Sequence, residues 1–178
     1  MRANEFKQRL DGKTYQEIAS GGGGITASVK QTRAASHTQL LTLLEKRLCR
    51  SLSLGVTTIE VKSGYGLGVT EEIKLLEVLQ QAQSKTVQEL VITCLALHAT
   101  PHEATSTQDY VDDMTKNLLP IIAKRKLASF VDAFVEKGYF EPAILDNFMH
   151  RAKELGLGIR IHADEFAPSN GAQAASRW

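Results

Sequence analysis

Residues 90–97 read LVITCLAL, the longest of four short apolar stretches that decide the fold. The other three are TTIEVK at 57–62, FVDAFV at 130–135 and GIRI at 158–161. β-Branched residues, which favour extended backbone, are frequent in three of the four. Short apolar runs bounded by turn-forming segments are typical of buried strands. The sequence therefore predicts four strands.

Helical patterns lie between the predicted strands, at 71–83, about 107–124 and 141–155. This alternation predicts an α/β fold whose parallel strands are joined by right-handed crossovers. A longer amphipathic helix precedes the first strand, from an N-cap at Ser36 to Gly55. The periodicity leaves open whether the strands close into a barrel or form a doubly wound sheet. Four glycines at 21–24 follow a short helical pattern near 15–19 and lack the GxGxxG spacing, which disfavours a dinucleotide site.

The composition narrows the class of protein without indicating its chemistry. The chain has 178 residues and a formal net charge of +1, which suits one domain and disfavours a nucleic-acid partner. No apolar run approaches the roughly 20 residues of a membrane span, and the first ten residues contain no signal-peptide core. Cys49 and Cys94 lie in apolar stretches and indicate buried thiols in a reducing compartment. We expect a single cytoplasmic domain over 1–178.

Chemically active side chains follow each predicted strand. They are Lys62, Ser63 and Tyr65 after the first strand, His98 after the second, Glu136 after the third, and His162, Asp164 and Glu165 after the fourth. Polar residues at the carboxyl ends of barrel strands converge on one mouth, where active sites are built. The sequence therefore predicts a site at this end of the sheet.

Several interpretations of these residues remain open on spacing alone. His162 with Glu165 suits a metal ion and a proton-transferring carboxylate, but a catalytic zinc takes three protein ligands, and no HxH or HExxH occurs. A strand-end histidine also suits a hydrogen bond to a neighbouring loop. Lys62 suits a Schiff base, or an ion pair with Glu60, Glu136 or Asp164.

With these residues in view, the whole chain resembles the imidazolonepropionase family of the amidohydrolase superfamily. The matching segments are RANEF at 2–6, TYQEI at 14–18, GGGI at 22–25, TRAAS at 32–36, GVTTIEVKSGYGL at 55–67, HATPHE at 98–103 and HADEF at 162–166. KSGYGL and HADEF, in this order and at this separation, are the most specific of them.

The resemblance implies a metal-dependent (β/α)8 barrel that hydrolyses 4-imidazolone-5-propanoate to N-formimidoyl-L-glutamate in histidine degradation, with one zinc or iron ion. By position in the motifs, His162 matches a metal ligand and Glu165 matches the acid that contacts the imidazolone ring and relays the proton. His98 matches the histidine at the ring carbonyl, where it would stabilise the oxyanion. Three residues match substrate-binding positions, and an arginine among them suits a propionate carboxylate: Tyr65, Tyr15 and Arg2.

The departures from the family pattern bear on activity. The family's HxH metal pair and its late aspartate ligand are missing, and the predicted strands are about half of the eight in a closed barrel. We therefore expect an internal segment that lacks both chain ends, has negligible ring-opening activity alone and forms a homo-oligomer through its open strand edges. The alternative is a non-catalytic carboxylate-binding module of the same fold, with the substrate as its small-molecule ligand.

Overall fold

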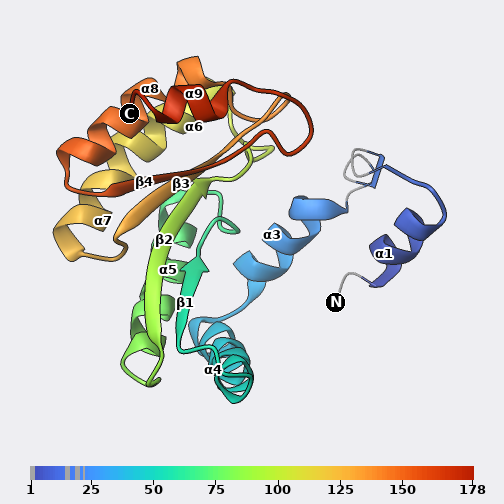
Figure 1. The fold of residues 1–178 in the computed structure, drawn as a ribbon, viewed down its shortest axis with the longest axis vertical. Helices are drawn as coiled ribbons and strands as arrows, with labels where there is room; N and C mark the ends of the chain where they lie inside the picture. The colour runs from blue at the N-terminus through green and yellow to red at the C-terminus, as the bar shows by residue number, and fades with distance from the viewer. Residues whose placement is uncertain (1–2, 15–16, 19–20, 22) are drawn as a thin grey trace.

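The computed structural model describes residues 3–14, 17–18, 21 and 23–178, and a parallel sheet lies at its centre (Figure 1). Its strands are β1 (Thr58–Lys62), β2 (Glu89–Leu97), β3 (Phe130–Val135) and β4 (Gly158–Ala163), paired in the order β1-β2-β3-β4. All four predicted strands are confirmed. β4 continues two residues beyond the predicted end at 161, so His162 lies within the strand rather than after it.

The sequential strand order decides between the two architectures that periodicity left open. A doubly wound sheet reverses its order at a switch point and carries helices on both faces. Sequential parallel strands with crossovers of one hand place every crossover helix on the same face, as in a (β/α)8 barrel. Figure 1 shows the strands as a curved layer with α5 behind β1 and β2. The chain is therefore an α/β fold of partial-barrel type.

The crossover helices lie close to their predicted positions. They are α5 (Val69–Gln83), α6 (Thr107–Asp113), a π-helical turn (Met114–Leu118) that continues into α7 (Leu119–Arg125), and α8 (Pro142–Glu154). Before β1, α4 (His37–Ser53) begins at Ser36, whose side chain accepts a hydrogen bond from the Gln39 amide in a capping box, as predicted. The one helix predicted at 107–124 is thus divided by the π-helical turn.

Three helices were not predicted. They are α1 (Ala3–Leu10), α3 (Gly24–Ala34) and α9 (Gly171–Ala175). Most of the helix predicted near 15–19 lies outside the described residues. α3 begins inside the glycine run and is fixed by tertiary contacts, because Val29 packs on Leu67 and Ala99. Figure 1 shows α1 and α3 leading away from the sheet toward the N-terminus.

The two faces of the sheet differ in character. Alternate strand residues form an apolar layer against the helices, including Val61, Ile92, Cys94, Val131, Ala133 and Val135, which pack with Leu76, Met114, Leu118 and Phe148. Burying each such large side chain contributes roughly 1.5–3 kcal/mol. The residues between them face the opposite side and carry the charged groups of the sheet. Within the described residues, no helix is both long and apolar enough to cross a membrane.

A β-bulge in β2 determines which side of the sheet His98 occupies. Thr93 and Cys94 pair with Phe130 and Val131, but Leu97 then pairs with Ala133, so β2 contains one extra residue. The extra residue reverses the alternation of side chains beyond it. Leu97 therefore joins the apolar core, and the following His98 faces the polar side.

Candidate functional site

Asp132, in the middle of β3, is the buried centre of the polar face. Its carboxylate is 0% exposed and accepts a hydrogen bond from Lys62 Nζ at 2.6 Å. Nδ1 of His162 lies 3.0 Å from the same carboxylate. A buried carboxylate requires such partners, because an unpaired charge is costly away from water. Asp132 was missed in the sequence analysis, although a charged residue inside an apolar strand was the available signal.

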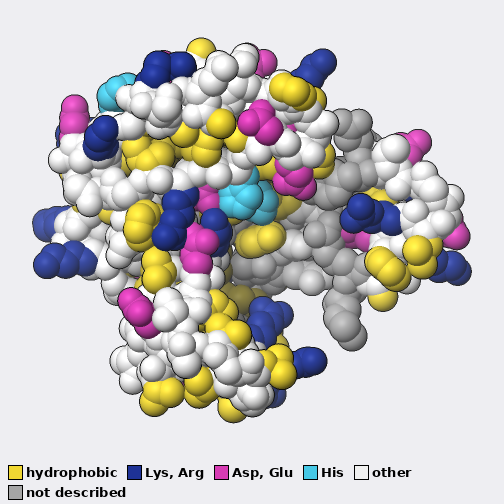
Figure 2. Space-filling view, in the orientation of Figure 1, with side chains coloured by type: hydrophobic (Ala, Val, Ile, Leu, Met, Phe, Trp, Pro, Cys, Tyr) yellow, Lys and Arg dark blue, Asp and Glu magenta, His cyan; other side chains and the backbone are white. Residues whose placement is uncertain are grey.

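A second carboxylate extends this network toward the amino ends of the strands. Glu60 accepts hydrogen bonds from Thr93 Oγ1 at 2.7 Å and Lys62 Nζ at 3.2 Å, and it forms an ion pair with Arg160. Desolvation opposes ionisation of Glu60, but these hydrogen bonds outweigh it and lower the pKa of its carboxyl group. Charged and histidine side chains accordingly gather over the sheet in Figure 2.

The sequence left Lys62 with two interpretations, a Schiff base or an ion pair, and its contacts favour the ion pair. Its ammonium group contacts Glu60, as predicted, and Asp132 rather than Glu136 or Asp164. An ammonium group held between two carboxylates is a structural element that joins β1 to β3.

His98 lies beside the loop that follows β1. Its Nδ1 is 3.0 Å from the Gly64 carbonyl oxygen, and its ring meets that of Tyr65 edge-on at 5.1 Å. Phe134 separates the two strand histidines, with its ring centroid 6.2 Å from that of His98 and 6.4 Å from that of His162. Desolvation lowers the pKa of His98. The structure therefore brings His98 and Tyr65 together, and the Phe134 ring lies beside both histidines.

A buried carboxylate and a guanidinium group fix the KSGYGL loop. Glu72, in the first turn of α5, accepts hydrogen bonds from the amides of Gly64, Gly66 and Leu67 at 2.8, 2.7 and 2.9 Å. Arg33 from α3 donates to the carbonyls of Gly66 and Leu67 at 2.6 and 3.0 Å. These backbone amides and carbonyls of the loop are not paired within a strand or helix, so the two side chains provide their hydrogen-bond partners.

The HADEF loop is fixed in the same way by Glu136, which is 1% exposed. One of its oxygens accepts the amides of Glu165 and Phe166, each at 2.9 Å, and the other accepts the amide of Lys137 at 3.0 Å. These backbone hydrogen bonds, that from Phe166 first, lower the pKa of Glu136. Glu165 lies on the exposed surface of this loop. Glu136 therefore supports the predicted site rather than facing a ligand.

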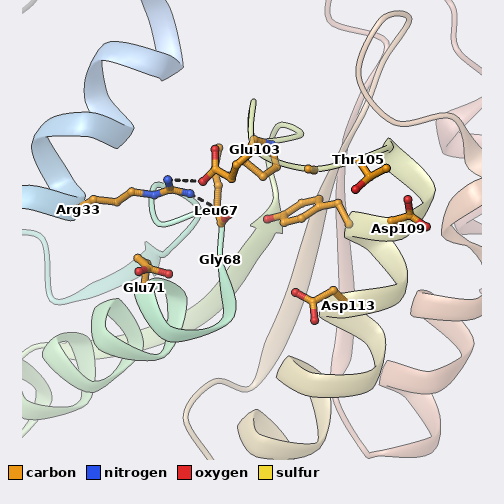
Figure 3. Close-up of a pocket in the computed structure, with 11 residues that line it drawn as sticks. Arg33, Leu67, Gly68, Glu71, Glu103, Thr105, Asp109 and Asp113 are labelled. Atoms are coloured by element: carbon orange, nitrogen blue, oxygen red, sulfur yellow. Dashed lines mark hydrogen bonds and ion pairs between the residues drawn. The ribbon is translucent and has the colours of Figure 1, made fainter.

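A pocket of about 370 Å³ lies between α3, the start of α5 and α6 (Figure 3). Arg33 and Glu103 form an ion pair at its edge, and Glu71, Asp109 and Asp113 contribute further carboxylates. None of the predicted site residues that the structure describes lines this pocket. The predicted site at the strand ends is therefore separate from this pocket.

The structure describes four of the six predicted site residues. Arg2 and Tyr15 lie outside the described residues. His162, whose side chain is 41% exposed, turns Nδ1 toward Asp132, which leaves Nε2 as the ring nitrogen that could take a ligand. Among the described residues, no three His, Cys, Asp or Glu side chains are grouped so as to hold a metal ion. His162 therefore fits as one ligand of an incomplete set.

Sequential parallel βα units with polar residues at their carboxyl ends define a segment of a (β/α)-barrel enzyme fold. The chain is homologous to imidazolonepropionases, enzymes of amidohydrolase-barrel type, along nearly its whole length. It is 46% identical over 178 residues to that of Idiomarina loihiensis, covering 99% of this chain and 44% of the relative. The imidazolonepropionase of Bdellovibrio bacteriovorus is 45% identical over 176 residues, which cover 99% of this chain and 41% of the relative. That of Pseudomonas paraeruginosa is 42% identical over 178 residues, which cover 99% of this chain and 44% of the relative.

These comparisons confirm the resemblance inferred from the motifs. The chain spans less than half the length of the curated relatives it matches. No family model matches the chain.

Proposed function

We propose that the protein is an imidazolonepropionase, which hydrolyses the cyclic amide of 4-imidazolone-5-propanoate to N-formimidoyl-L-glutamate in L-histidine degradation in the cytoplasm. Water adds to the ring carbonyl carbon, the ring C–N bond breaks, and the departing nitrogen takes a proton. The observation that carries the proposal is the placement of KSGYGL and HADEF, the two motif loops, at the carboxyl ends of β1 and β4. Identity of 41–46% to enzymes of this name supports it.

The residues of this chain have separate roles in the proposal. Glu165 contacts the imidazolone ring and carries the proton to the departing nitrogen. His98, once protonated, donates a hydrogen bond to the carbonyl oxygen as negative charge develops there. Tyr65 binds the substrate with two residues outside the described parts, Tyr15 and Arg2, whose guanidinium group suits the propionate carboxylate.

The metal in this proposal is zinc or iron, since imidazole and carboxylate ligands suit both. It would supply an activated water when bound. His162 would hold it through Nε2, with Asp132 orienting the ring. The described residues provide one such ligand, which is fewer than the three typical of catalytic zinc sites, so we expect negligible turnover from these 178 residues alone.

Metal analysis together with a hydrolysis assay tests the proposal. We compare this chain with a form extended at both ends to the length of its relatives. The extended form should bind stoichiometric zinc or iron and open the imidazolone ring. His162→Ala should abolish both properties, whereas His150→Ala, on an exposed helix surface, should abolish neither. An extended, metal-loaded form without turnover would contradict the proposed activity.

The same experiment separates the alternative function, a carboxylate-binding module. The described residues contain no group of three metal ligands, so a module built from them would bind the ligand without metal and without hydrolysing it. Binding without hydrolysis is therefore the outcome that favours the module. We therefore titrate the 178-residue chain with imidazole-4-propionate in the presence of a chelator. Tight binding, together with an inactive extended form, would establish the module in place of the hydrolase.

We also propose that residues 1–178 form one domain that self-associates. β1 and β4 each have one paired neighbour in the described sheet, which leaves both sheet edges open. Sedimentation velocity at several concentrations should show reversible dimers or larger species. Thr58→Lys, which adds a charge on the β1 edge, should weaken association, and Ser53→Lys on α4 should not. A monomer at all concentrations would contradict association.

A further inference from the structure

Gly64 joins a buried carboxylate to the histidine beside the site through its own N–H and C=O groups, which belong to two successive peptide units. The amide of Gly64 donates to Oε2 of Glu72 at 2.8 Å, and the carbonyl oxygen of Gly64 lies 3.0 Å from Nδ1 of His98. Glu72 is 0% exposed, and it accepts hydrogen bonds from the amides of the KSGYGL loop. The proposed reaction gives His98 a role and leaves Glu72 without one.

The sense of these hydrogen bonds fixes the proton on His98. A carbonyl oxygen only accepts, so the Nδ1 atom of His98 must carry the hydrogen. In a neutral imidazole the other nitrogen, Nε2, then has a free lone pair. Desolvation lowers the pKa of His98, which favours this neutral form before a proton is taken up. Nε2 is therefore the nitrogen left for a ligand.

The backbone of Gly64 is itself tightly held. Glu72 also accepts the amides of Gly66 and Leu67, so three bonds hold the loop to the first turn of α5. Gly64 has φ +99°, and a Cβ there would lie 2.5 Å from the Leu95 carbonyl oxygen. Gly64, whose carbonyl orients His98, is therefore held by Glu72 through its amide and is packed against β2.

We propose that Glu72 is a positioning residue, which acts through the backbone of Gly64 to fix the tautomer and place of His98 for the imidazolone ring. The identity of the ligand in this inference rests on the proposed function. The geometry that links Glu72 to His98 does not. A glutamine at position 72 has one accepting oxygen in place of two. Glu72→Gln therefore leaves at least one of the three loop amides without an acceptor, and the side-chain orientation that keeps two of the three bonds is the one that releases the Gly64 amide.

Nitrogen-15 NMR of the histidine rings tests the geometry directly, with the His98 signals assigned from their loss in His98→Asn. The wild-type chain should show a protonated Nδ1 and an unprotonated Nε2. Glu72→Gln should show averaging between the two tautomers. Glu71→Gln is the matched control, because it removes the same charge from the same helical turn while leaving the three hydrogen bonds to the loop amides in place, and it should match the wild type.

Binding of imidazole-4-propionate, measured by calorimetry, is the second readout. Glu72→Gln should raise the dissociation constant about tenfold, and Glu71→Gln should leave it unchanged. A folded Glu72→Gln with wild-type ring signals would overturn the inference. If Glu72→Gln does not fold, the wild-type spectrum decides alone, since a neutral His98 ring with its proton on Nε2 would overturn the inference. Failure of the wild type to bind the probe would count against the proposed function, while the ring signals would still test Glu72.

Discussion

Nδ1 of His162 lies 3.0 Å from a carboxylate oxygen of Asp132, and the Asp132 side chain is entirely buried. The same carboxylate holds Lys62 at 2.6 Å, so one acid connects three of the four strands. This contact uses one nitrogen of the His162 ring and leaves the other for a ligand. Asp132 therefore links the stability of the sheet to the orientation of the residue that matches a metal ligand.

Asp132→Asn should destabilise the chain. Removing one partner of a fully buried ion pair typically costs about 3–5 kcal/mol. Lys62 is 26% exposed and keeps Glu60 as a second partner, so we expect a smaller loss of about 2 kcal/mol in the free energy of unfolding. Urea unfolding measures it.

Glu154→Gln is the control for this substitution. Glu154 is 64% exposed and pairs with Arg151 on the surface of α8, so its loss should cost less than about 0.5 kcal/mol. Equal effects of the two substitutions would show that Asp132 is not a buried structural centre.

The KSGYGL loop provides a comparison of two glycines. Gly64→Ala introduces a Cβ 2.5 Å from the Leu95 carbonyl oxygen at a positive φ of +99°. Gly138 has a similar φ of +86° and open space around it, so Gly138→Ala introduces backbone strain without a steric clash. We expect losses in the free energy of unfolding of about 3 kcal/mol at Gly64 and about 1 kcal/mol at Gly138.

Thermal and urea unfolding of the two variants measure the difference. Because φ is similar at the two sites, the excess loss at Gly64 reports its contact with β2. If both variants lose the same stability, the close approach of the loop to Leu95 does not constrain the fold.

Much of the fold could be predicted from the sequence because its signals are local. Apolar stretches marked the strands, and Ser36 marked a helix start. The side of the sheet on which His98 lies depends on the bulge in β2, which only pairing with β3 reveals. The helix α3 depends on the packing of Val29 against loops distant in sequence.

The candidate site was predicted in part for the same reason. His98 and His162 stand at the ends of apolar strands and were recognised there. The roles of Asp132 and Glu72 become clear only from their partners, which lie 30 and 70 residues from Asp132 and five to eight residues from Glu72. The sequence shows an acid in a strand and an acid in a helix start, but not what each acid holds.

Glu136 should make stability depend on pH in the acidic range. Backbone hydrogen bonds, that from Phe166 first, lower its folded-state pKa from the ordinary value of 4.5. A lowered folded-state pKa means that the folded form binds its proton less readily than the unfolded form. The stabilisation is therefore complete above pH 4.5 and is lost as the pH falls through the lower folded-state value.

Urea midpoints between about pH 7 and about pH 3 measure this dependence. Glu136→Gln should remove Glu136's share of the decline on the acid side. Glu141→Gln is the control, because Glu141 precedes α8 without a side-chain capping bond, and it should leave the decline in place. Identical profiles for wild type and Glu136→Gln would contradict a role for this carboxylate in holding the HADEF loop.

The two cysteines should differ in reactivity, contrary to the expectation that both are buried. Cys49 lies on the exposed surface of α4, so its predicted burial is wrong, because helical periodicity does not fix which face of a helix packs. Cys94 is fully buried in β2, and desolvation raises the pKa of its thiol to about 12. At about pH 8, a thiol reagent should label one cysteine in the folded chain and both in urea. Cys49→Ser should abolish the native labelling, and rapid labelling of Cys94 in that folded variant would show that β2 is not buried beneath the helices.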